Sequence, residues 1–383
     1  MHLVLKSLFA ALVLSPVALA QAAPTTTPLA LPAGHSANAP VPPPPSVTAK
    51  QYVLVDYQTG RVLAEQGGDE RVPPASITKV MTSYVVAAER RAGKIKDSDL
   101  VTISENAWRH GGAVTDGSTS FLELNSQVPL GDLLKGMIIQ SGNDASIAIA
   151  EHVAGSEATF AALMNQYAEK LGLKNSHFVN AHGLYDPDHY MSAHDIAELS
   201  RALVRDFPEE YAHYALKEFT WNNHTQRNRN ILLWRDPSVD GIKTGHLSQA
   251  GYCLAASAKR GDTRLIAVVM NTAGEKVRAD EAHALLNYGF RFFETHKVYE
   301  AMAQISEVAL WHGEAAKASL GVAQPVLVTL PRGAYARLAA TMNVQKPLSA
   351  PLNKGQAVGT FKLALDGQTV YEGKIDTLKR FKD

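Results

Sequence analysis

The sequence predicts an α/β (α+β) region over residues 48–294, followed by a small all-β domain over residues 295–383. Two observations lead to this fold class. Strand-like hydrophobic runs stand near both ends of the first region, and helical patterns lie between and after them. Beyond residue 295 the candidate elements are strands alone, which predicts a separate β-rich unit.

The first region opens with a predicted hairpin and continues with helices. Residues 51–57 and 61–65 are strand-like and are joined by a Gln-Thr-Gly turn. Apolar residues then recur every three or four positions from Ile77 to Ala88, which predicts a helix with one buried face. The same spacing predicts further helices over residues 133–139, 145–153 and 157–171.

The later elements follow from the same patterns. Residues 252–258 and 265–270 are strand-like and are separated by an Arg-Gly-Asp turn, and residues 279–294 predict a closing helix. Strands of the final domain are expected over residues 325–330, 356–365 and 368–371. Asp366-Gly367 stands where a tight hairpin turn is expected.

The N-terminus is typical of an export signal followed by a linker. A short basic start precedes a mostly apolar run over residues 7–20 and A-x-A sites, so residues 1–23 predict a signal peptide. An uncleaved anchor is the alternative, although a membrane span needs about 20 apolar residues. Residues 24–47 are rich in proline, alanine and threonine, which predicts an extended linker without a core.

Composition argues against several function classes. Lys and Arg total 37, as do Asp and Glu, and long basic runs are missing, so no nucleic-acid partner is expected. The single cysteine, Cys253, stands in an apolar run, which favours a buried strand residue over a catalytic thiol. No cofactor or metal is expected, because the fourteen histidines form no H-E-x-x-H pattern and no cysteines are paired.

The pattern Ser76-Ile77-Thr78-Lys79 predicts a nucleophile with its base. Ser76 follows two prolines and an alanine and is expected near a helix N-terminus, with Lys79 one turn later on the same face. A lysine acts as a base only when burial or nearby positive charge lowers its pKa, and Lys243 is a candidate for that charge. The alternative is a capping serine followed by a surface lysine.

The pattern Ser141-Gly142-Asn143 separates two predicted helices. A polar turn between buried helices can direct a hydroxyl and an amide into a cleft, where Ser141 would pass protons and Asn143 would hold a substrate amide. A bare turn is the alternative. The same pattern recurs at Ser36-Ala37-Asn38, in the predicted linker, and at Ser104-Glu105-Asn106, which is expected to be no more than a turn.

The pattern Lys243-Thr244-Gly245 precedes the later strand-like runs. A lysine and a threonine on a strand can bind a substrate carboxylate, and the glycine lets an extended substrate approach the backbone. The next backbone N–H, together with that of Ser76, could form an oxyanion hole. An ordinary strand entry is the alternative.

In this order, the three patterns resemble those of the low-molecular-mass penicillin-binding proteins, the D-alanyl-D-alanine carboxypeptidases of the penicillin-binding protein 5/6 type. The likeness extends to Asn228-Arg229-Asn230, to residues 241–246 and to residues 288–294. It implies a serine penicillin-recognising, transpeptidase-like fold, in which an antiparallel sheet carries helices on both sides.

The resemblance also implies a reaction and its residues. Ser76 would be the acyl-enzyme nucleophile, Lys79 its proton acceptor and Ser141 the proton shuttle. Residues implied in substrate binding are Asn143, Lys243, Thr244, Gly245, His246, Arg229 and Arg278. The implied reaction removes the terminal D-alanine from a peptidoglycan pentapeptide stem in the periplasm, and β-lactams would acylate the same serine.

Three alternatives share these residues. A β-lactamase has the same patterns, but the class A enzymes use a glutamate that residues 182–190 lack. A murein D,D-endopeptidase differs only in substrate. A peptidoglycan-binding protein without catalysis is disfavoured because all the motif residues are present.

The C-terminus is where the sequence departs from the family. Many members end in an amphipathic helix that lies on the inner membrane. In residues 374–383, Ile375, Leu378 and Phe381 could share a helix face among basic residues. So short a segment falls below the roughly 12–15 residues that an isolated helix needs, so contact with the inner-membrane surface is expected to be weak.

Overall fold

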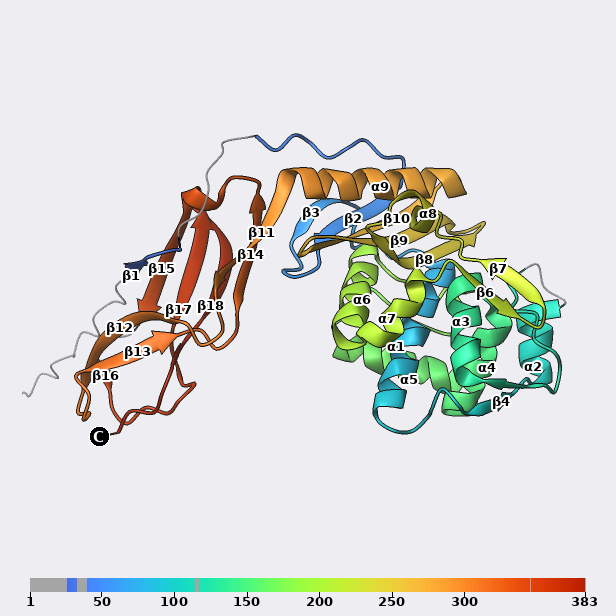
Figure 1. Ribbon diagram of the computed structural model, residues 1–383, viewed down its shortest axis with the longest axis horizontal. Coiled ribbons are helices and arrows are strands. Elements are labelled where there is room, and N and C mark those ends of the chain that lie inside the picture. Colours follow the sequence, from blue (N-terminus) through green and yellow to red (C-terminus); the bar gives the residue numbers. More distant parts are fainter. Residues whose placement is uncertain (1–25, 33–39, 114–116, 345, 383) are drawn as a thin grey trace, which may run out of the picture. The chain divides into compact units, whose positions relative to one another are not determined.

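The computed structural model describes residues 26–32, 40–113, 117–344 and 346–382, and the chain divides into two compact units (Figure 1). The larger unit comprises Ala33–Val298 and Leu327–Arg337, and the smaller unit takes the remaining residues. The predicted signal peptide, residues 1–23, lies outside the described residues, as does the Ser36-Ala37-Asn38 pattern.

A five-stranded antiparallel sheet organises the larger unit. Its strand order is β3-β2-β10-β9-β8, and every neighbouring pair is antiparallel. The strands are β2 (Gln51–Asp56), β3 (Val62–Gln66), β8 (Val239–Leu247), β9 (Gly251–Arg260) and β10 (Thr263–Thr272). These strands confirm the hairpin and the two later strands that the sequence predicts.

Helices cover both faces of this sheet, as the resemblance implies (Figure 1). The face covered by α9 (Glu275–Phe292) is opposite the face that packs against α1 (Thr78–Arg91) and α6 (Ala193–Asp206). The remaining helices are α2 (Glu105–Trp108), α3 (Leu130–Gln140), α4 (Asn143–Ala154), α5 (Glu157–Lys170), α7 (Pro208–Tyr211) and α8 (Leu232–Arg235). Short helical turns are η1 (Ala75–Ile77), η2 (Arg109–Ala113) and η3 (Ala212–Ala215).

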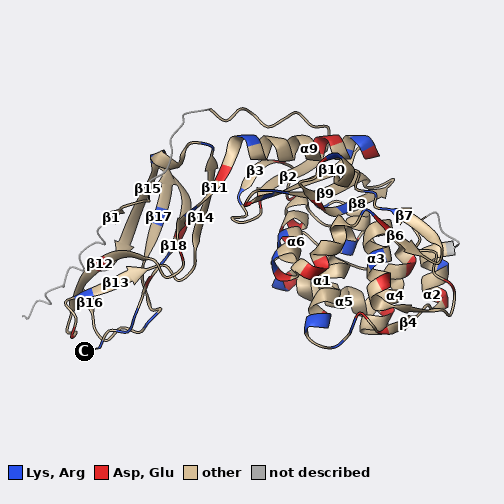
Figure 2. Cartoon of the chain, in the orientation of Figure 1, with Lys and Arg blue, Asp and Glu red and all other residues tan. Residues whose placement is uncertain are grey.

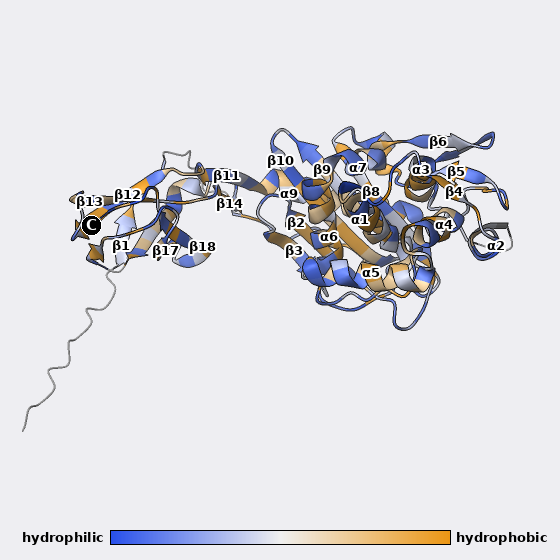
Figure 3. Ribbon diagram, turned by 90° about the horizontal axis from the view of Figure 1, so that it is seen from below, coloured by the Kyte–Doolittle hydropathy of each residue, from blue (hydrophilic) through white to orange (hydrophobic). Residues whose placement is uncertain are grey.

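Burial on both faces explains the nearly continuous hydrophobic runs in the strands. Successive side chains of a strand point to opposite faces, so alternate residues enter two different cores. In β2, Val53 and Val55 join the cluster that contains α1, whereas Leu54 joins the cluster that contains α9. Figure 3 shows hydrophobic residues along these central elements. A sheet packed in this way holds β8, which carries one of the motifs, rigidly.

Short two-stranded sheets complete the larger unit. The pairs are β4 (Leu100–Thr102) with β5 (Gln127–Pro129), β6 (Glu218–Trp221) with β7 (His224–Arg227), and β11 (Phe293–Tyr299) with β14 (Val326–Pro331). The predicted closing helix ends at Phe292 rather than at residue 294, because Phe293 and Glu294 already belong to β11.

The smaller unit is all-β, as the sequence predicts. Its seven-stranded sheet has the order β1-β15-β17-β18-β13-β12-β16. The strands are β1 (Thr26–Leu29), β12 (Gln304–Trp311), β13 (Lys317–Gly321), β15 (Leu338–Val344), β16 (Leu348–Ser349), β17 (Ala357–Leu365) and β18 (Gln368–Thr377). One short turn, η4 (Tyr335–Arg337), precedes β15. Strands β17 and β18 form an antiparallel hairpin around Asp366-Gly367, which confirms the predicted turn.

Two expectations about the ends of the chain are wrong. Residues 26–29, assigned to a linker, form β1 and pair antiparallel with β15, because a proline can lie in an edge strand. The C-terminal segment is not the beginning of an amphipathic helix. Residues 374–377 belong to β18, and Ile375 and Phe381 are 0% and 3% exposed. Their apolar side chains are thus buried in the β unit rather than available to a membrane.

The surface of the larger unit carries charges of both signs. Figure 2 shows basic and acidic residues interspersed over its helices, in agreement with the balanced composition. Among the described residues, every helix is too short or too polar to span a lipid bilayer.

Candidate active site

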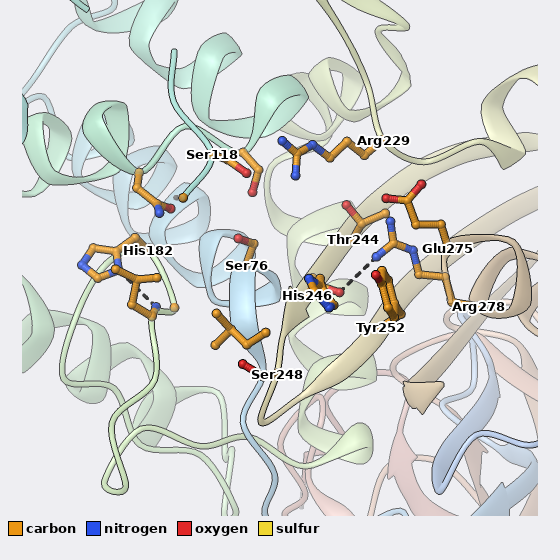
Figure 4. Close-up of a pocket in the computed structure, with 17 residues that line it drawn as sticks. Ser76, Ser118, His182, Arg229, Thr244, His246, Ser248, Tyr252, Glu275 and Arg278 are labelled. Atoms are coloured by element: carbon orange, nitrogen blue, oxygen red, sulfur yellow. Dashed lines mark hydrogen bonds between the residues drawn. The ribbon is translucent and has the colours of Figure 1, made fainter. Parts of the chain in front are cut away.

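The three sequence motifs meet around one cavity of about 490 Å³ in the larger unit. Figure 4 shows Ser76 between His182 on one side and Thr244 and His246 on the other, with Ser118 and Arg229 along a third edge. Ser141, Asn143, Gly245 and Arg278 also line the cavity. Residues that are more than a hundred positions apart in sequence therefore face one another.

Ser76 lies in η1, directly before α1, as the sequence predicts. The turn begins at Ala75, whose φ of 49° is unusual for a residue with a side chain. Lys79 Nζ lies 2.9 Å from Ser76 Oγ, so the hydroxyl and the amine are in direct hydrogen-bond contact. Two further acceptors fix the amine, since Lys79 Nζ donates to Asn143 Oδ1 at 2.7 Å and to the His182 carbonyl at 2.9 Å.

The environment of Lys79 favours the neutral amine. Its side chain is 1% exposed. Burial, and after it the positive charge of Arg229, lowers the pKa of Lys79 to about 7, although the carboxylate of Asp144 opposes the shift. Lys243, the candidate charge from the sequence, is buried as well. Burial first, and then the charge of Lys79, holds the pKa of Lys243 well below its ordinary value. The charge that lowers the pKa of Lys79 is therefore that of Arg229 rather than that of Lys243, whereas the charge of Lys79 does act on Lys243.

Ser141 and Asn143 stand where α3 ends and α4 begins, in the polar turn that the sequence predicts. Ser141 adopts a left-handed conformation with φ of 63°, which ends α3 and turns the side chain toward the cavity. Within the described residues, Ser141 Oγ is buried without a hydrogen-bond partner. A buried hydroxyl without a partner costs free energy, so its place in the site calls for a functional explanation.

Strand β8 brings Thr244 and Gly245 to the cavity wall, and Lys243 lies buried directly before them in the strand. Lys243 is 3% exposed, and its Nζ donates to the Thr244 carbonyl at 3.1 Å. A Cβ atom at Gly245 would fall 2.9 Å from the Pro74 carbonyl oxygen and 3.2 Å from the Ser76 nitrogen. Glycine at this position therefore lets β8 approach the backbone of the nucleophile closely.

The basic residues named by the resemblance also lie at the cavity. Arg278 extends from α9, is 3% exposed, and donates from Nη1 to the Gly245 carbonyl at 3.1 Å. Arg229 is exposed between two buried asparagines. The side-chain amide of Asn228 donates to the Leu216 carbonyl, and that of Asn230 donates to the Gly241 carbonyl. These two bonds explain why the arginine stands within an Asn-Arg-Asn pattern.

His246, the residue after Gly245, also lines the cavity. Its ring stacks on Tyr252 with ring centroids 3.9 Å apart.

Sequence reasoning missed His182, which lines the cavity and binds Lys79 through its carbonyl. Its Nδ1 accepts from the Leu184 N–H at 3.1 Å, and its Nε2 lies 3.3 Å from Glu157. Burial lowers the pKa of His182, so the ring is neutral near pH 7 and Nε2 carries the proton toward Glu157. The following Gly183 has φ of +93°, and a Cβ there would lie 1.9 Å from the Ala75 carbonyl. In the sequence, His182 is marked only by this following glycine, which is typical of a tight backbone turn.

Asp144 is a second missed residue, and it supports the cavity from behind. It is 1% exposed, and its carboxylate accepts from the Ser120 N–H at 2.8 Å, the Leu122 N–H at 3.2 Å and Thr119 Oγ1 at 2.9 Å. These bonds hold the segment that follows Ser118 against α4. Burial raises the pKa of Asp144, although these donors oppose the shift.

Two sequence features play no part in the cavity. Ser104 caps α2 by accepting from the Ala107 N–H at 3.0 Å, so the Ser104-Glu105-Asn106 match is a helix start rather than a simple turn. Cys253 is 0% exposed in β9, which confirms a buried strand residue, and burial raises the pKa of its thiol to about 11. Among the described residues, no group of three or more His, Cys, Asp or Glu side chains is arranged to hold a metal ion.

Comparison with known proteins agrees with this geometry. Residues 36–274 match the D-alanyl-D-alanine carboxypeptidase family of peptidases, S11, and residues 293–382 match the penicillin-binding protein 5 C-terminal domain. The chain belongs to the D-alanyl-D-alanine carboxypeptidase family. Its activity is therefore that of a serine-type carboxypeptidase of this family.

Relatives are similar over most of their length. D-alanyl-D-alanine carboxypeptidase DacA of Escherichia coli K12 is 46% identical over 346 residues, which cover 90% of this chain and 86% of the relative. DacF of Bacillus subtilis is 37% identical over 333 residues, or 85% of this chain and 84% of the relative.

Solved structures show the same fold, which confirms the predicted fold class. Penicillin-binding protein 5 of Haemophilus influenzae superposes with a TM-score of 0.85 at 44% identity, over 89% of this chain and 99% of that chain. Penicillin-binding protein D2 of Listeria monocytogenes, solved with ampicillin bound, gives a TM-score of 0.59 at 26% identity, over 65% of this chain and 100% of that chain.

Proposed function

We propose that this carboxypeptidase removes the terminal D-alanine from peptidoglycan pentapeptide stems through an acyl-enzyme on Ser76. The observation that carries the proposal is the 2.9 Å contact between Ser76 Oγ and the buried amine of Lys79. A serine is activated as a nucleophile by an adjacent base, and a lysine with a pKa of about 7 is neutral in a large fraction of molecules at neutral pH.

The terminal carboxylate of the substrate would complete this activation. It would bind among Lys243, Thr244 and the nearby arginines, where a negative charge favours the protonated form of Lys243. A charge fixed on Lys243 makes protonation of Lys79 harder, because both amines are buried. The bound substrate would thus help keep Lys79 as the base that takes the proton of Ser76.

The remaining residues take roles that follow from their positions. The N–H groups of Ser76 and of His246, the residue after Gly245, would stabilise the oxyanion of the tetrahedral intermediate. Asn143, already bonded to Lys79, would hold the substrate amide. Ser141 Oγ, which is buried without a partner among the described residues, would carry the proton to the departing D-alanine. Water would then hydrolyse the acyl-enzyme.

β-Lactams are proposed to acylate Ser76 as well, in line with the ampicillin-bound relative. Residues 182–190 contain no glutamate that could activate water as in class A β-lactamases, so the adduct is expected to hydrolyse slowly. Rapid turnover of benzylpenicillin would contradict this expectation.

The cellular setting is also a proposal. The basic and apolar pattern of residues 1–23 supports export, so the mature enzyme would act in the periplasm, where peptidoglycan lies. Residues 24–47 would then precede the catalytic region of residues 48–294 and the β domain of residues 295–383. Fractionation of native cells distinguishes a periplasmic protein from one held at the inner-membrane surface.

One assay tests the proposed function. The full chain and its Ser76→Ala variant are incubated with a muramyl pentapeptide and, separately, with a cross-linked muropeptide dimer, and products are separated by chromatography. Release of D-alanine from the pentapeptide by the wild type alone supports the proposal. Cleavage of the dimer without D-alanine release would instead identify an endopeptidase. D-Alanine release by Ser76→Ala would show that Ser76 is not the nucleophile.

A further inference from the structure

The cavity wall that holds the basic residues also carries a carboxylate, that of Glu275. Glu275 is the first residue of α9, and Arg278 lies three residues later, so both side chains stand on one face of the helix. Both line the cavity, and Figure 4 shows Glu275 beside Arg278 and near Thr244. Among the described residues that line the cavity, Glu275 is the one acidic side chain.

The position of Glu275 is not explained by structural bonds. Its side chain is exposed, and within the described part of the chain it makes no hydrogen bond and no ion pair. Its negative charge does act on Arg278, whose pKa is lowered by burial and raised back in part by Glu275. An acidic side chain in the first turn of a helix interacts favourably with the helix dipole. This interaction explains an acidic residue at the start of α9, but it does not explain why that residue faces the cavity.

The negative charge of Glu275 opposes the binding of a substrate that ends in a carboxylate. A peptide ending in D-alanyl-D-alanine brings a carboxylate to Thr244 and Arg278, next to the carboxylate of Glu275. Two like charges that bind to the same wall of a cavity repel each other, and the charge of Glu275 also offsets part of the attraction that Arg278 exerts on the substrate. Since the side chain is exposed, the repulsion is moderate and depends on ionic strength.

We propose that Glu275 is a specificity-determining residue that weakens the binding of the substrate's terminal carboxylate by sharing the charge of Arg278. The inference rests on the proposed function, because it assumes that this carboxylate binds beside Thr244. Glu275 thereby sets how strongly the enzyme prefers substrates with a free, negatively charged C-terminus. The basic residues alone would bind such substrates, and their hydrolysis product, more tightly.

A charge series at this position tests the proposal. The variants are Glu275→Asp, Glu275→Gln and Glu275→Lys, each assayed for D-alanine release from a pentapeptide at low and high salt. The expected kcat/KM is within twofold of wild type for Asp, about threefold or more higher for Gln at low salt, and higher again for Lys, mainly through KM. The differences are expected to shrink at high salt, because the charges are screened.

A matched control lies on the same helix. Asp280→Asn also removes one negative charge from α9, but Asp280 lies outside the cavity and pairs with Arg235 at 2.7 Å, so its kcat/KM is expected to remain within twofold of wild type. A flat series, a lower kcat/KM for Glu275→Gln, or an increase that salt does not reduce would overturn the proposal. A lower value would mean that Glu275 positions Arg278 instead.

The Ser76→Ala variant separates this inference from the proposed function. If Ser76→Ala abolishes D-alanine release and the charge series is flat, the role of Glu275 is wrong and the proposed function stands. If Ser76→Ala retains full activity, the proposed function fails, and the inference that rests on it fails as well.

Discussion

At the scale of single residues, the site depends on placing two buried amines close together. Lys79 is 1% exposed and Lys243 is 3% exposed, in a region where a single charge is already costly. Burial lowers the pKa of both amines, so the site disfavours two charged lysines at the same time. The acceptors around Lys79 keep its nitrogen aligned with Ser76 in either state.

The pH dependence of the acylation rate should reveal the lowered pKa of Lys79. The neutral amine is the active form of Lys79, so the rate of acylation by a chromogenic β-lactam is expected to rise with pH and to reach half its maximum near pH 7. A free lysine would place this midpoint near pH 10.4. Stopped-flow kinetics from pH 5 to 10 measures it, and a midpoint near 10 would exclude a neutral Lys79 at physiological pH.

Ser141 combines a catalytic hydroxyl with an unfavourable backbone conformation. Its φ of 63° lies in the left-handed region, which costs a residue with a side chain about 1–2 kcal/mol. Ser141→Gly and Ser141→Ala both remove the hydroxyl, and each is expected to lower kcat/KM by a factor of about 100 or more. Because glycine adopts this conformation freely, Ser141→Gly should be about 0.5–1 kcal/mol more stable than Ser141→Ala. Chemical denaturation measures the difference, and equal stabilities would argue against strain at Ser141.

At the scale of elements, the segment over residues 178–190 is fastened to the start of α1. Thr78 Oγ1 lies 2.7 Å from His189 Nε2, and His189 Nδ1 accepts from the Val179 N–H at 3.0 Å, so the ring is neutral and its Nε2 donates. Burial is the main cause that lowers the pKa of His189 to about 4. The carbonyl of His182, in the same segment, then reaches Lys79.

This fastening should make stability depend on pH. The unfolded chain binds a proton at His189 below about pH 6.5, whereas the folded chain resists protonation until about pH 4. The free energy of unfolding therefore falls as the pH is lowered from 6.5 to 4, by about 3 kcal/mol from this residue. The loss between pH 7 and pH 4 should be smaller by that amount in His189→Gln, whose amide retains a donor and an acceptor. An equal loss of unfolding free energy in the wild type and in His189→Gln would contradict a buried, neutral His189 ring.

Periodicity predicted the helices and central strands well, but it could not predict contacts between distant segments. The helix that begins near Ile77 and the two strands that follow Lys243 are found close to their expected bounds. The sequence marks His182 only through the glycine that follows it, and it does not mark Glu275, because the roles of both residues arise only when the segment after Phe178 and the start of α9 close around the cavity. The prolines before residue 30 concealed β1, because they are typical of linkers as well as of edge strands.

At the scale of the whole molecule, each unit has its own core, and the C-terminal residues belong to the smaller one. Ile375 is 0% exposed in β18, and Phe381 forms an antiparallel bridge with Leu352. The apolar spacing of residues 375, 378 and 381 suggested a helix face, yet three residues cannot distinguish this spacing from a strand followed by a loop. Tertiary packing decides the conformation.

Burial in the smaller unit predicts a stability effect that spares the active site. Ile375→Ala should destabilise the smaller unit by about 3 kcal/mol, because it leaves a cavity in a packed core. Lys374→Ala, at the exposed neighbouring position, should change stability by less than about 0.5 kcal/mol. Calorimetry measures both changes, and kcat/KM for the pentapeptide should remain within twofold of wild type. A large loss of activity in Ile375→Ala would contradict the view that the larger and the smaller unit have independent hydrophobic cores.

The central claim is that Ser76 is the nucleophile, and mass spectrometry of the benzylpenicillin-treated protein tests it most directly. We predict one adduct per chain with the full mass of the antibiotic, located by peptide mapping on the segment that contains Ser76 and missing from Ser76→Ala. An adduct on a different residue, or one that persists in Ser76→Ala, would contradict this account of the site.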